Sequence, residues 1–395
     1  MEILFENKLA IVACLKNESP YIEEWLEYHS RIGIDKFYLY DNDSEDRSEL
    51  QKILAPWIDQ KIVELTEFHG DYAQIPAYND AVLKHRFDCK YLAFIDLDEF
   101  IVPKQNRELI EIIDSLFQTQ TDPQIRIGGV GINWRNFGSN GQEKKLPGGV
   151  LERFKKRAPD AFRPNIHVKT ITNPRRVNRR VNPHNVIYYI DNICVNENGV
   201  EVPLYFNEQN TVKKIQLNHY FTKSREEFMA KVDRGRPETP KKRDPKMFDR
   251  YQRDEVEDLT ALNLFNQFFR FYKMNDDQST IRDLKFMLAE ENPNIELLLT
   301  CFHRAHSLKD QSQREKYESE SLEKILKIQD MPIYESQLFL DTLPELLLTS
   351  TQYRGKIVNR GIELFKNLAE FYRQKNQFVE FVDYLRRREL LESIR

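Results

Sequence analysis

Two aspartates spaced two residues apart carry the clearest chemical signal in the sequence. Asp96 and Asp98 follow the apolar run Tyr91 to Ile95, which is typical of a strand buried on both faces. In an extended chain both carboxylates leave the same side of the strand, and Glu99 leaves the other side, where we expect it to serve as an ion-pair partner. Two carboxylates this close repel each other unless a cation or hydrogen-bond donors compensate them. A divalent metal is the simplest compensation; a turn cap or pairing with Arg and Lys is the alternative.

The segments before this motif alternate between strand and helix periodicity. Strands are expected at Leu9 to Leu15, Lys36 to Tyr40, Ile62 to Leu65 and Tyr91 to Ile95, with a helix between each pair. This βαβαβαβ order predicts a parallel sheet with right-handed crossovers, in which ligands bind beyond the carboxyl ends of the strands. Polar segments follow the strands at those ends, namely Lys16 to Glu18, Asp41 to Asp46, and Asp96 with Asp98.

Composition limits the classes of protein that the chain can represent. Its 395 residues carry a net charge of −4 with 31% charged side chains, which argues against nucleic acid as a partner. The four cysteines have no paired spacing, so neither a disulfide framework nor a zinc site is expected. No basic-then-apolar leader opens the chain, and no apolar run approaches the ~18 residues that span a bilayer. We therefore expect a cytoplasmic protein, with peripheral contact at the inner face of the membrane left open.

Glycine usage divides the chain into two parts. Of the 13 glycines, 11 lie at or before Gly235, and amphipathic helical patterns follow. We predict an α/β domain at residues 1–235, with a nucleotide-binding half (1–105) and an acceptor half (106–235), and then a helical domain at 236–395. The boundary is placed in Arg234 to Pro245, which is rich in proline and basic residues.

The helical part is expected to bind rather than to catalyse. Its predicted helices include Leu259 to Tyr272 and Ile281 to Ala289, and a helical hairpin at Arg354 to Arg387 turns at Gln374 to Gln377. The terminal stretch Tyr384 to Arg395 mixes Leu with Arg, so contact with a membrane or a protein partner competes with a plain solvated helix.

The loop after the first strand lacks the glycines of a dinucleotide-binding fingerprint. Cys14 to Glu18 stands there instead of Gly-x-Gly-x-x-Gly, so the pyrophosphate of a bound nucleotide must be held by a metal and by side chains. Asp96 and Asp98 would bind that metal. The chemistry that this suits is displacement at a sugar carbon with a nucleoside diphosphate leaving, where Mg²⁺ or Mn²⁺ stabilises the developing charge.

Several segments together resemble a known family. They are Leu9 to Asp46, Tyr91 to Val102, Asn133 to Gly141, His167 to Ile171, and Leu217 to Gly235. In this order they resemble glycosyltransferase family 92 and related bacterial family 2-like enzymes of the GT-A superfamily. The resemblance implies a GT-A type, Rossmann-like mixed sheet flanked by helices. It also implies metal-dependent, inverting transfer of a sugar, with galactose known as a donor sugar in the family, from a UDP-linked or other nucleotide sugar to a glycan or lipid-linked glycan.

The resemblance also assigns roles to individual residues by position. Asp96 would contact the ribose and the metal, Asp98 would be the direct metal ligand, and His219 would be the late metal ligand. Gln74 matches a further family position at the donor. The residue types agree, because an imidazole beside two carboxylates suits Mn²⁺ better than Mg²⁺. A lone histidine is more often packed or exposed than a ligand.

Other residues are candidates for donor binding. Asp41 ends the second strand, where its carboxylate could accept from a base or ribose, and Asn17 and Cys14 could line the same pocket. The alternative for the Asp41 to Asp46 segment is a solvated, helix-capping loop. The cations Lys223, Lys231 and Arg234 flank His219 and could close over the diphosphate.

The acceptor side is less defined. Seven glycines lie between residues 128 and 149 around Trp134, which suits a sugar stacked on an indole, or a hinge with a buried Trp. Ten Lys or Arg but one acid lie from Arg153 to Arg180, either as a guide for an anionic substrate or as a solvated face.

Inverting transfer also needs a base for the acceptor hydroxyl, which the sequence does not identify. The candidates are Asp160, Asp191, Glu152 and His184. The rival to catalysis is a non-catalytic protein that binds a glycan or a partner and keeps the GT-A fold.

Overall fold

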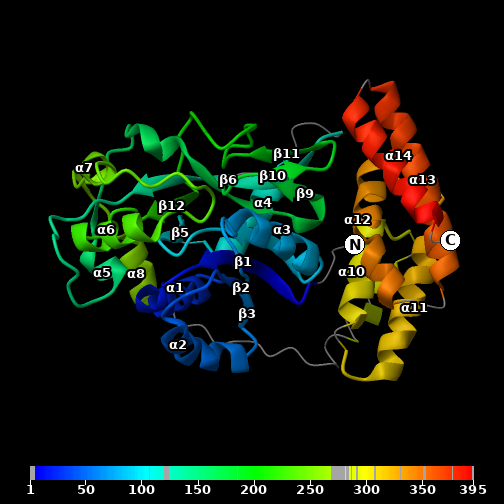
Figure 1. Cartoon of the computed structure of the whole chain (residues 1–395), viewed down its shortest axis with the longest axis horizontal. Coiled ribbons are helices and arrows are strands. Elements are labelled where there is room, and N and C mark those ends of the chain that lie inside the picture. The colour runs from blue at the N-terminus through cyan, green and yellow to red at the C-terminus, as the bar shows by residue number, and fades with distance from the viewer. Residues whose placement is uncertain are drawn as a thin grey trace. The chain divides into compact units, whose positions relative to one another are not determined.

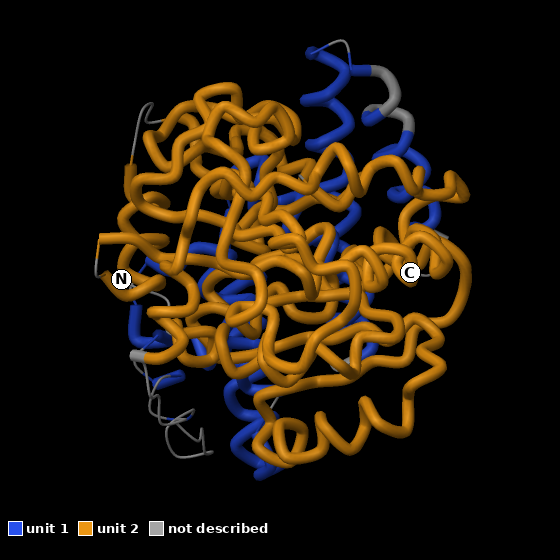
Figure 2. Tube along the Cα trace, turned by 90° about the vertical axis from the view of Figure 1, so that its left-hand side faces the viewer, with its two compact units in different colours: residues 1–6, 275–395 blue, residues 7–274 orange. Residues whose placement is uncertain are grey.

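The chain forms two compact units (Figure 2). The computed structural model describes residues 5–105, 107–119, 124–184, 186–267, 281, 284–285, 287–290, 292–306, 308–329, 331–349, 353–375 and 377–393. Residues 7–274 make the α/β unit, and residues 1–6 with 275–395 make the helical unit. The division therefore falls nearly forty residues beyond the expected 235/236 boundary.

Three short elements explain why the α/β unit extends past residue 235. Helix α7 (Met247–Tyr251) buries Phe248 against Phe221 and Phe228. Strand β13 (Val256–Glu257) pairs with β7 (Lys156–Arg157), and α8 (Thr260–Gln267) places Ala261 in the main core. The Pro-rich segment that suggested a linker is an internal loop, because the Gln74 N–H donates to the Pro237 carbonyl at 3.2 Å.

The first half of the sheet is parallel, as predicted. Its strands are β1 (Asn7–Leu15), β2 (Lys36–Asp41), β3 (Val63–Glu67) and β4 (Cys89–Phe94), in the order β3-β2-β1-β4. The helices between them are α1 (Ser19–Arg31), α2 (Arg47–Asp59) and α3 (Gln74–His85).

Helices cover both faces of this sheet because side chains alternate along its strands. Leu9, Ile11 and Ala13 pack with α1, α2 and α4 (Leu109–Phe117), whereas Ala10 and Val12 pack with α3. Figure 1 shows α1 and α2 on one side of the first strands and α3 on the other. Residues from all four parallel strands are buried, which matches the continuous apolar runs in the sequence.

The second half of the sheet brings distant segments to one edge. It adds β5 (Glu99–Pro103), β6 (Arg126–Asn136), β8 (Val168–Thr172), β11 (Asn192–Val195) and β12 (Ile215–His219). The nine-stranded sheet runs β3-β2-β1-β4-β8-β6-β12-β5, with β11 beside β6. Strand β8 is antiparallel to both β4 and β6, and β12 is parallel to β6. The carboxyl ends of β4, β6 and β12 therefore lie at the same edge.

The remaining elements of the α/β unit are short. They are α5 (Val150–Arg153), β9 (Val177–Arg180), β10 (Val186–Tyr188), α6 (Arg225–Arg234) and 3₁₀ turns at Arg163–Ile166 and Pro174–Arg176.

The helical unit confirms the expected all-helical pattern after the α/β unit. It contains α10 (Ile295–His306), α11 (Gln311–Lys327), α12 (Ile333–Thr349), α13 (Arg354–Gln374) and α14 (Phe378–Ser393). The hairpin turn lies between α13 and α14, where it was predicted. Of the helix expected at Leu259 to Tyr272, residues 260–267 form α8, and residues 268–272 lie outside the described residues, as does part of Ile281 to Ala289.

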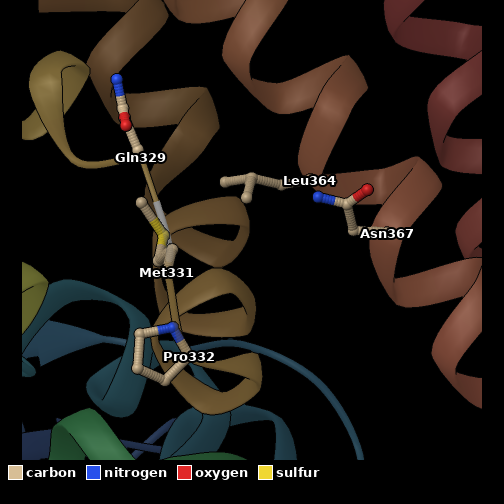
Figure 3. A pocket seen from close by; sticks show the side chains of 5 residues that line it. All are labelled: Gln329, Met331, Pro332, Leu364 and Asn367. Atoms are coloured by element: carbon tan, nitrogen blue, oxygen red, sulfur yellow. The ribbon is translucent and has the colours of Figure 1, made fainter.

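Two further observations concern these helices. Within the described part of the chain, no helix combines the length and the apolar character needed to cross a bilayer. A pocket of about 360 Å³ is lined by Gln329, Met331, Pro332, Leu364 and Asn367 (Figure 3). None of these five side chains is charged, so the pocket offers no titratable group for chemistry.

Candidate functional site

The two aspartates lie in a tight turn rather than on a continuing strand. Strand β4 ends at Phe94, and the Glu99 N–H donates to the Asp96 carbonyl at 3.0 Å, which closes the turn from Asp96 to Glu99. The Glu99 carboxylate stabilises this reversal because its Oε2 accepts from the Asp96 N–H at 2.8 Å. The extended geometry expected for this motif is thus replaced by a turn, although both carboxylates still lie at the edge where the parallel strands end.

The Asp96 carboxylate is held by three donors. Its Oδ1 accepts from Gln74 Nε2 at 2.8 Å and from the Tyr78 hydroxyl at 3.2 Å, and its Oδ2 accepts from Lys169 Nζ at 2.8 Å. The Lys169 side chain is 1% exposed. Burial disfavours its charge, but Asp96 and Glu99 outweigh this and raise the Lys169 pKa. The first aspartate is therefore compensated by a cation of the protein itself.

Asp98 lies among cationic side chains. The ammonium of Lys231 donates to its Oδ2. Burial opposes ionisation, but Lys231, His219 and Lys223 outweigh it and hold the pKa of Asp98 well below its usual range. Asp98 is therefore a carboxylate at every physiological pH.

His219 lies near Asp98 at the end of β12. Its Nε2 lies 3.7 Å from Asp98 Oδ1, and its Nδ1 lies 3.1 Å from Asn136 Oδ1. The Asn136 amide donates its Nδ2 to Asn165 at 2.9 Å, so its oxygen faces the ring. Nδ1 therefore carries the proton, and the Nε2 lone pair points at the carboxylate.

A bound cation would stabilise the arrangement of His219 and Asp98. Burial lowers the His219 pKa to about 3, so the ring is neutral at pH 7. A lone pair and a carboxylate oxygen then face each other. This arrangement, with the other ring nitrogen hydrogen-bonded behind, is the one found at metal-ligating histidines.

The three residues expected to bind a metal are brought together only in part. Asp98 and His219 come together, while Asp96 is directed to Lys169 and Gln74. Among the described residues, no three His, Cys, Asp or Glu side chains converge as a ligand group. The donor set fits an ion bound by one carboxylate and one imidazole, whose other positions would be filled by phosphate oxygens and water.

The candidate donor residues at the ends of β1 and β2 serve mainly their own loops. Asp41 is 1% exposed, and its carboxylate accepts from the Ser44 N–H at 3.1 Å and from Arg47 Nε at 3.3 Å. Asn17 Oδ1 accepts from the Glu45 N–H at 2.7 Å. These contacts hold the loop together, but the segment is not the solvated, helix-capping loop of the alternative, because Asp41 is buried and α2 has no side-chain cap.

Cys14 lies between the two carboxylate groups. Burial, with Asp96 and Asp41 nearby, raises the pKa of its thiol to about 12. The thiol is therefore neutral, and it can line a pocket but not act as a nucleophile at pH 7.

The predicted basic residues of α6 are brought to the site. Lys231 contacts Asp98, the Lys223 ammonium lies 3.4 Å from the centre of the Tyr21 ring, and Arg234 donates to Glu18 at 2.7 Å. Arg243, which we had not selected, adds a further cation, since Asp98 acts on its pKa although burial lowers that pKa overall.

Trp134 is buried rather than presented to solvent. It is 8% exposed, its Nε1 donates to Glu99 Oε1 at 2.7 Å, and its ring lies between His219 at 4.2 Å and His167 at 4.9 Å. The indole thus supports the turn and the histidine. Trp134 is buried, as in the alternative, but it lies within strand β6 rather than in a hinge. A sugar cannot stack on it while both faces are occupied.

The basic run from Arg153 to Arg180 serves internal contacts. Arg175 donates to backbone carbonyls, including that of Cys89 at 2.7 Å, Arg153 pairs with Glu227, and Lys169 pairs with Asp96. These three residues therefore form neither a surface that guides an anionic substrate nor a solvated face. Lys169 was detectable only as a lysine inside an apolar strand segment, His167 to Ile171.

The candidate bases lie in different parts of the α/β unit. Asp191 precedes β11 and accepts from the Arg126 N–H at the start of β6. Arg126 and Asn136 are at opposite ends of that strand, roughly 30 Å apart. Asp191 is therefore not brought to the site.

Of the other two acidic candidates for the base, one is held in ion pairs and the other is exposed on a helix. Asp160 pairs with Arg135 at 3.1 Å and with Arg157 at 2.8 Å, and Glu152 lies exposed on α5.

His184 is the candidate base that reaches the site rings. It meets Trp134 edge-on at 5.3 Å, and its Nδ1 donates to the Val168 carbonyl at 3.2 Å, which leaves the Nε2 lone pair available. Burial and the nearby Lys169 lower its pKa well below the usual value, so the ring is neutral.

The fold and site define an α/β protein with a carboxylate and imidazole pair at the carboxyl edge of its parallel strands, where open α/β sheets bind their ligands. The sequence profile of glycosyltransferase family 92 matches residues 11–254 of this chain. The chain belongs to glycosyltransferase family 92.

Three relatives match parts of this chain. A family 92 protein of Oryza sativa is 27% identical over 173 residues, covering 40% of this chain and 28% of the rice protein. A beta-1,4-galactosyltransferase of Caenorhabditis elegans is 32% identical over 109 residues, covering 25% of this chain and 26% of its own length. A galactan beta-1,4-galactosyltransferase of Arabidopsis thaliana is 31% identical over 109 residues, covering 25% of this chain and 21% of its own length. The chain thus spans under a third of each of these relatives.

Proposed function

We propose that this protein is a GT-A type glycosyltransferase that moves a sugar, with galactose as the first candidate, from a UDP-sugar to a glycan or lipid-linked glycan with inversion at the sugar carbon. Family membership supports the reaction class, and the names of the worm and Arabidopsis relatives support the sugar. The observation that carries the proposal is the His219 lone pair facing the Asp98 carboxylate at 3.7 Å.

The residues around the turn have separate proposed roles. Asp98 and His219 hold Mn²⁺ or Mg²⁺, which when bound supplies positive charge to stabilise the leaving diphosphate. Gln74, Tyr78 and Lys169 fix the Asp96 carboxylate, which leaves the exposed part of its oxygens for a ribose hydroxyl. The nucleotide would then lie beside the ends of β1 and β2, next to Cys14.

The cations of α6 act on the diphosphate. Lys231 holds a positive charge at Asp98, and Lys223 and Arg234 lie on the same helix and the loop before it. Charges fixed in a partly buried site stabilise a leaving diphosphate more strongly than exposed charges do, because water screens them less.

His184 is the proposed base for the acceptor hydroxyl. Its neutral ring keeps Nε2 unprotonated at pH 7. A low pKa makes it a weak base, so proton transfer would follow departure of the diphosphate rather than drive it.

One observation favours the non-catalytic alternative. Both aspartates already carry an ammonium partner, Lys169 on Asp96 and Lys231 on Asp98, so the protein's own cations compensate the turn. A glycan- or partner-binding protein with this fold would need no more than that.

Calorimetry and thermal unfolding with UDP and Mn²⁺ separate the two functions. A glycosyltransferase binds UDP more tightly with Mn²⁺ than without it, and saturation raises Tm by roughly 5 °C or more. Asp98→Ala removes the Mn²⁺-dependent part of both signals. Asp191→Ala, at the other end of the sheet, is the matched control and keeps them.

Failure to bind any of a panel of nucleoside diphosphates with Mn²⁺ supports the non-catalytic function instead. If binding is seen, hydrolysis of a panel of UDP-sugars then identifies the donor sugar.

A further inference from the structure

A row of aromatic rings extends from the His219 position toward the surface. Trp134 stacks on His167 at 4.9 Å and meets His184 at 5.3 Å. His184 lies 5.8 Å from the Tyr205 ring, and Phe206 lies 4.6 Å from His167. Trp134 is buried, whereas the four outer rings are each half-buried, so the row has a covered inner end and an accessible outer part.

The outer rings are held in place by backbone hydrogen bonds between separate segments. The Val168 N–H donates to the Tyr205 carbonyl at 3.1 Å, and His167 and Phe206 form an isolated β-bridge. His184 is fixed through its Nδ1 bond to the Val168 carbonyl. All these rings are thus anchored to the start of β8, the strand that also presents Lys169 to Asp96.

The position of this row matches the acceptor side of the reaction. One end adjoins the ring of His219 through Trp134, and His184 is close enough to Lys169 for that ammonium to lower its pKa. The nucleotide is expected at the ends of β1 and β2, on the far side of Asp96 from β8 in the sheet order. The aromatic row therefore borders the site from the side that the donor nucleotide leaves open.

The chemistry of the outer rings suits a sugar. A pyranose has apolar C–H faces that pack on aromatic rings and hydroxyls that need donors and acceptors at the ring edges. His184 and Tyr205 offer both a ring face and a polar edge atom. We propose that His184 and Tyr205, backed by His167 and Phe206, form the subsite that binds the terminal pyranose of a glycan acceptor, in place of Trp134. This inference rests on the proposed glycosyltransferase function.

The test compares ring loss with ring retention at one position. Wild-type protein with UDP-galactose and Mn²⁺ is screened for transfer on an array of defined glycans, and KM is measured for the best glycan and for the donor. Tyr205→Ala is expected to raise the acceptor KM about tenfold and to leave the donor KM unchanged. Tyr205→Phe, which keeps the ring face, stays within about threefold of the wild type. Leu204→Ala, at a neighbouring side chain that is 58% exposed, is the control and changes neither constant.

The outcomes are distinguishable from a failure of the proposed function. UDP binding and UDP-sugar hydrolysis need no acceptor, so their absence contradicts the glycosyltransferase itself. The subsite is overturned if Tyr205→Ala leaves the acceptor KM unchanged or raises the donor KM equally. It is also overturned if a wild-type protein that hydrolyses UDP-galactose transfers sugar to no glycan on the array.

Discussion

Lys169 supplies a positive charge beside Asp96. The spacing of Asp96 and Asp98 had led us to assign that charge to a metal. Removing one partner of a buried ion pair leaves the other charge uncompensated, which costs ~3–5 kcal/mol. We expect Lys169→Met to lower the free energy of unfolding by that amount, and the double variant Lys169→Met with Asp96→Asn to recover more than half of the loss. Urea unfolding followed by circular dichroism measures both values.

A surface pair provides the control for this prediction. Lys84 and Asp80 lie 2.8 Å apart on α3, with Lys84 53% exposed. Lys84→Met should change the stability by ~1 kcal/mol or less. An equal loss at the two lysines would show that the buried pair has no special role.

Glu99 is predicted to hold the shape of the turn. It is fully buried and accepts from the Asp96 N–H and from Trp134 Nε1. Glu99→Gln turns an amide donor toward one of these donors, so we expect a loss of ~1–3 kcal/mol in stability and a weaker affinity for UDP with Mn²⁺. Glu23→Gln, on the exposed face of α1, should alter neither property. Retained affinity in Glu99→Gln would mean that the turn keeps its geometry without this carboxylate.

The residues that the sequence identified at the site are those with unusual types or spacing. Asp96, Asp98 and His219 stood out as polar groups at the ends of apolar strands, and the structure brings the latter two within 3.7 Å. Asp41 stood out in the same way, but its carboxylate is bonded within its own loop. Lys169 was missed because a lysine among other basic residues looks like a solvated side chain, and sequence alone does not reveal its burial.

Helix α6 carries two of the site's cations, Lys231 and Arg234, and depends on one carboxylate for its position. Glu227 accepts from Arg153, from the Ser224 N–H and from the Tyr21 hydroxyl, and its side chain is 4% exposed. Burial opposes ionisation, but hydrogen bonds from Arg153 and Ser224 lower the Glu227 pKa from 4.5 to about 2.

This shift predicts a defined pH dependence. Because the folded pKa is depressed, the stabilisation is complete above the unfolded pKa of 4.5 and is lost as the pH falls toward 2. The shift corresponds to ~3 kcal/mol at neutral pH. The difference in unfolding free energy between wild type and Glu227→Gln should therefore shrink as the pH is lowered from about 5 to about 2. A constant difference over that range would contradict the assignment.

The elements differ in how well local patterns predict them. Strands β1 to β4 were predicted within about two residues, and a helix was predicted between each pair of them, because local periodicity and short crossovers determine these elements. The pairing of β12 between β5 and β6 was not predicted, since it joins segments more than 80 residues apart. Local patterns do not encode such a register.

At the scale of the whole molecule, the boundary of the α/β unit is testable. A fragment of residues 7–274 keeps α7, β13 and α8, whereas a fragment of residues 7–235 exposes the apolar surface around Phe228 and leaves β7 unpaired. We expect the longer fragment to unfold cooperatively and to bind UDP with Mn²⁺. The shorter one should lose cooperative unfolding in circular dichroism and in tryptophan fluorescence. Equal behaviour of the two fragments would place the boundary at residue 235.

The late position of β12 also has a consequence for synthesis. His219 follows Asp98 by 121 residues in the sequence. At roughly 5–20 residues per second, a ribosome needs about 6 to 24 seconds to cover that distance. During this interval the nascent chain presents the aspartate turn without the histidine and without the strand that separates β5 from β6. The pair formed by Asp98 and His219 can therefore form only after residue 219 of the α/β unit, residues 7–274, has been synthesised.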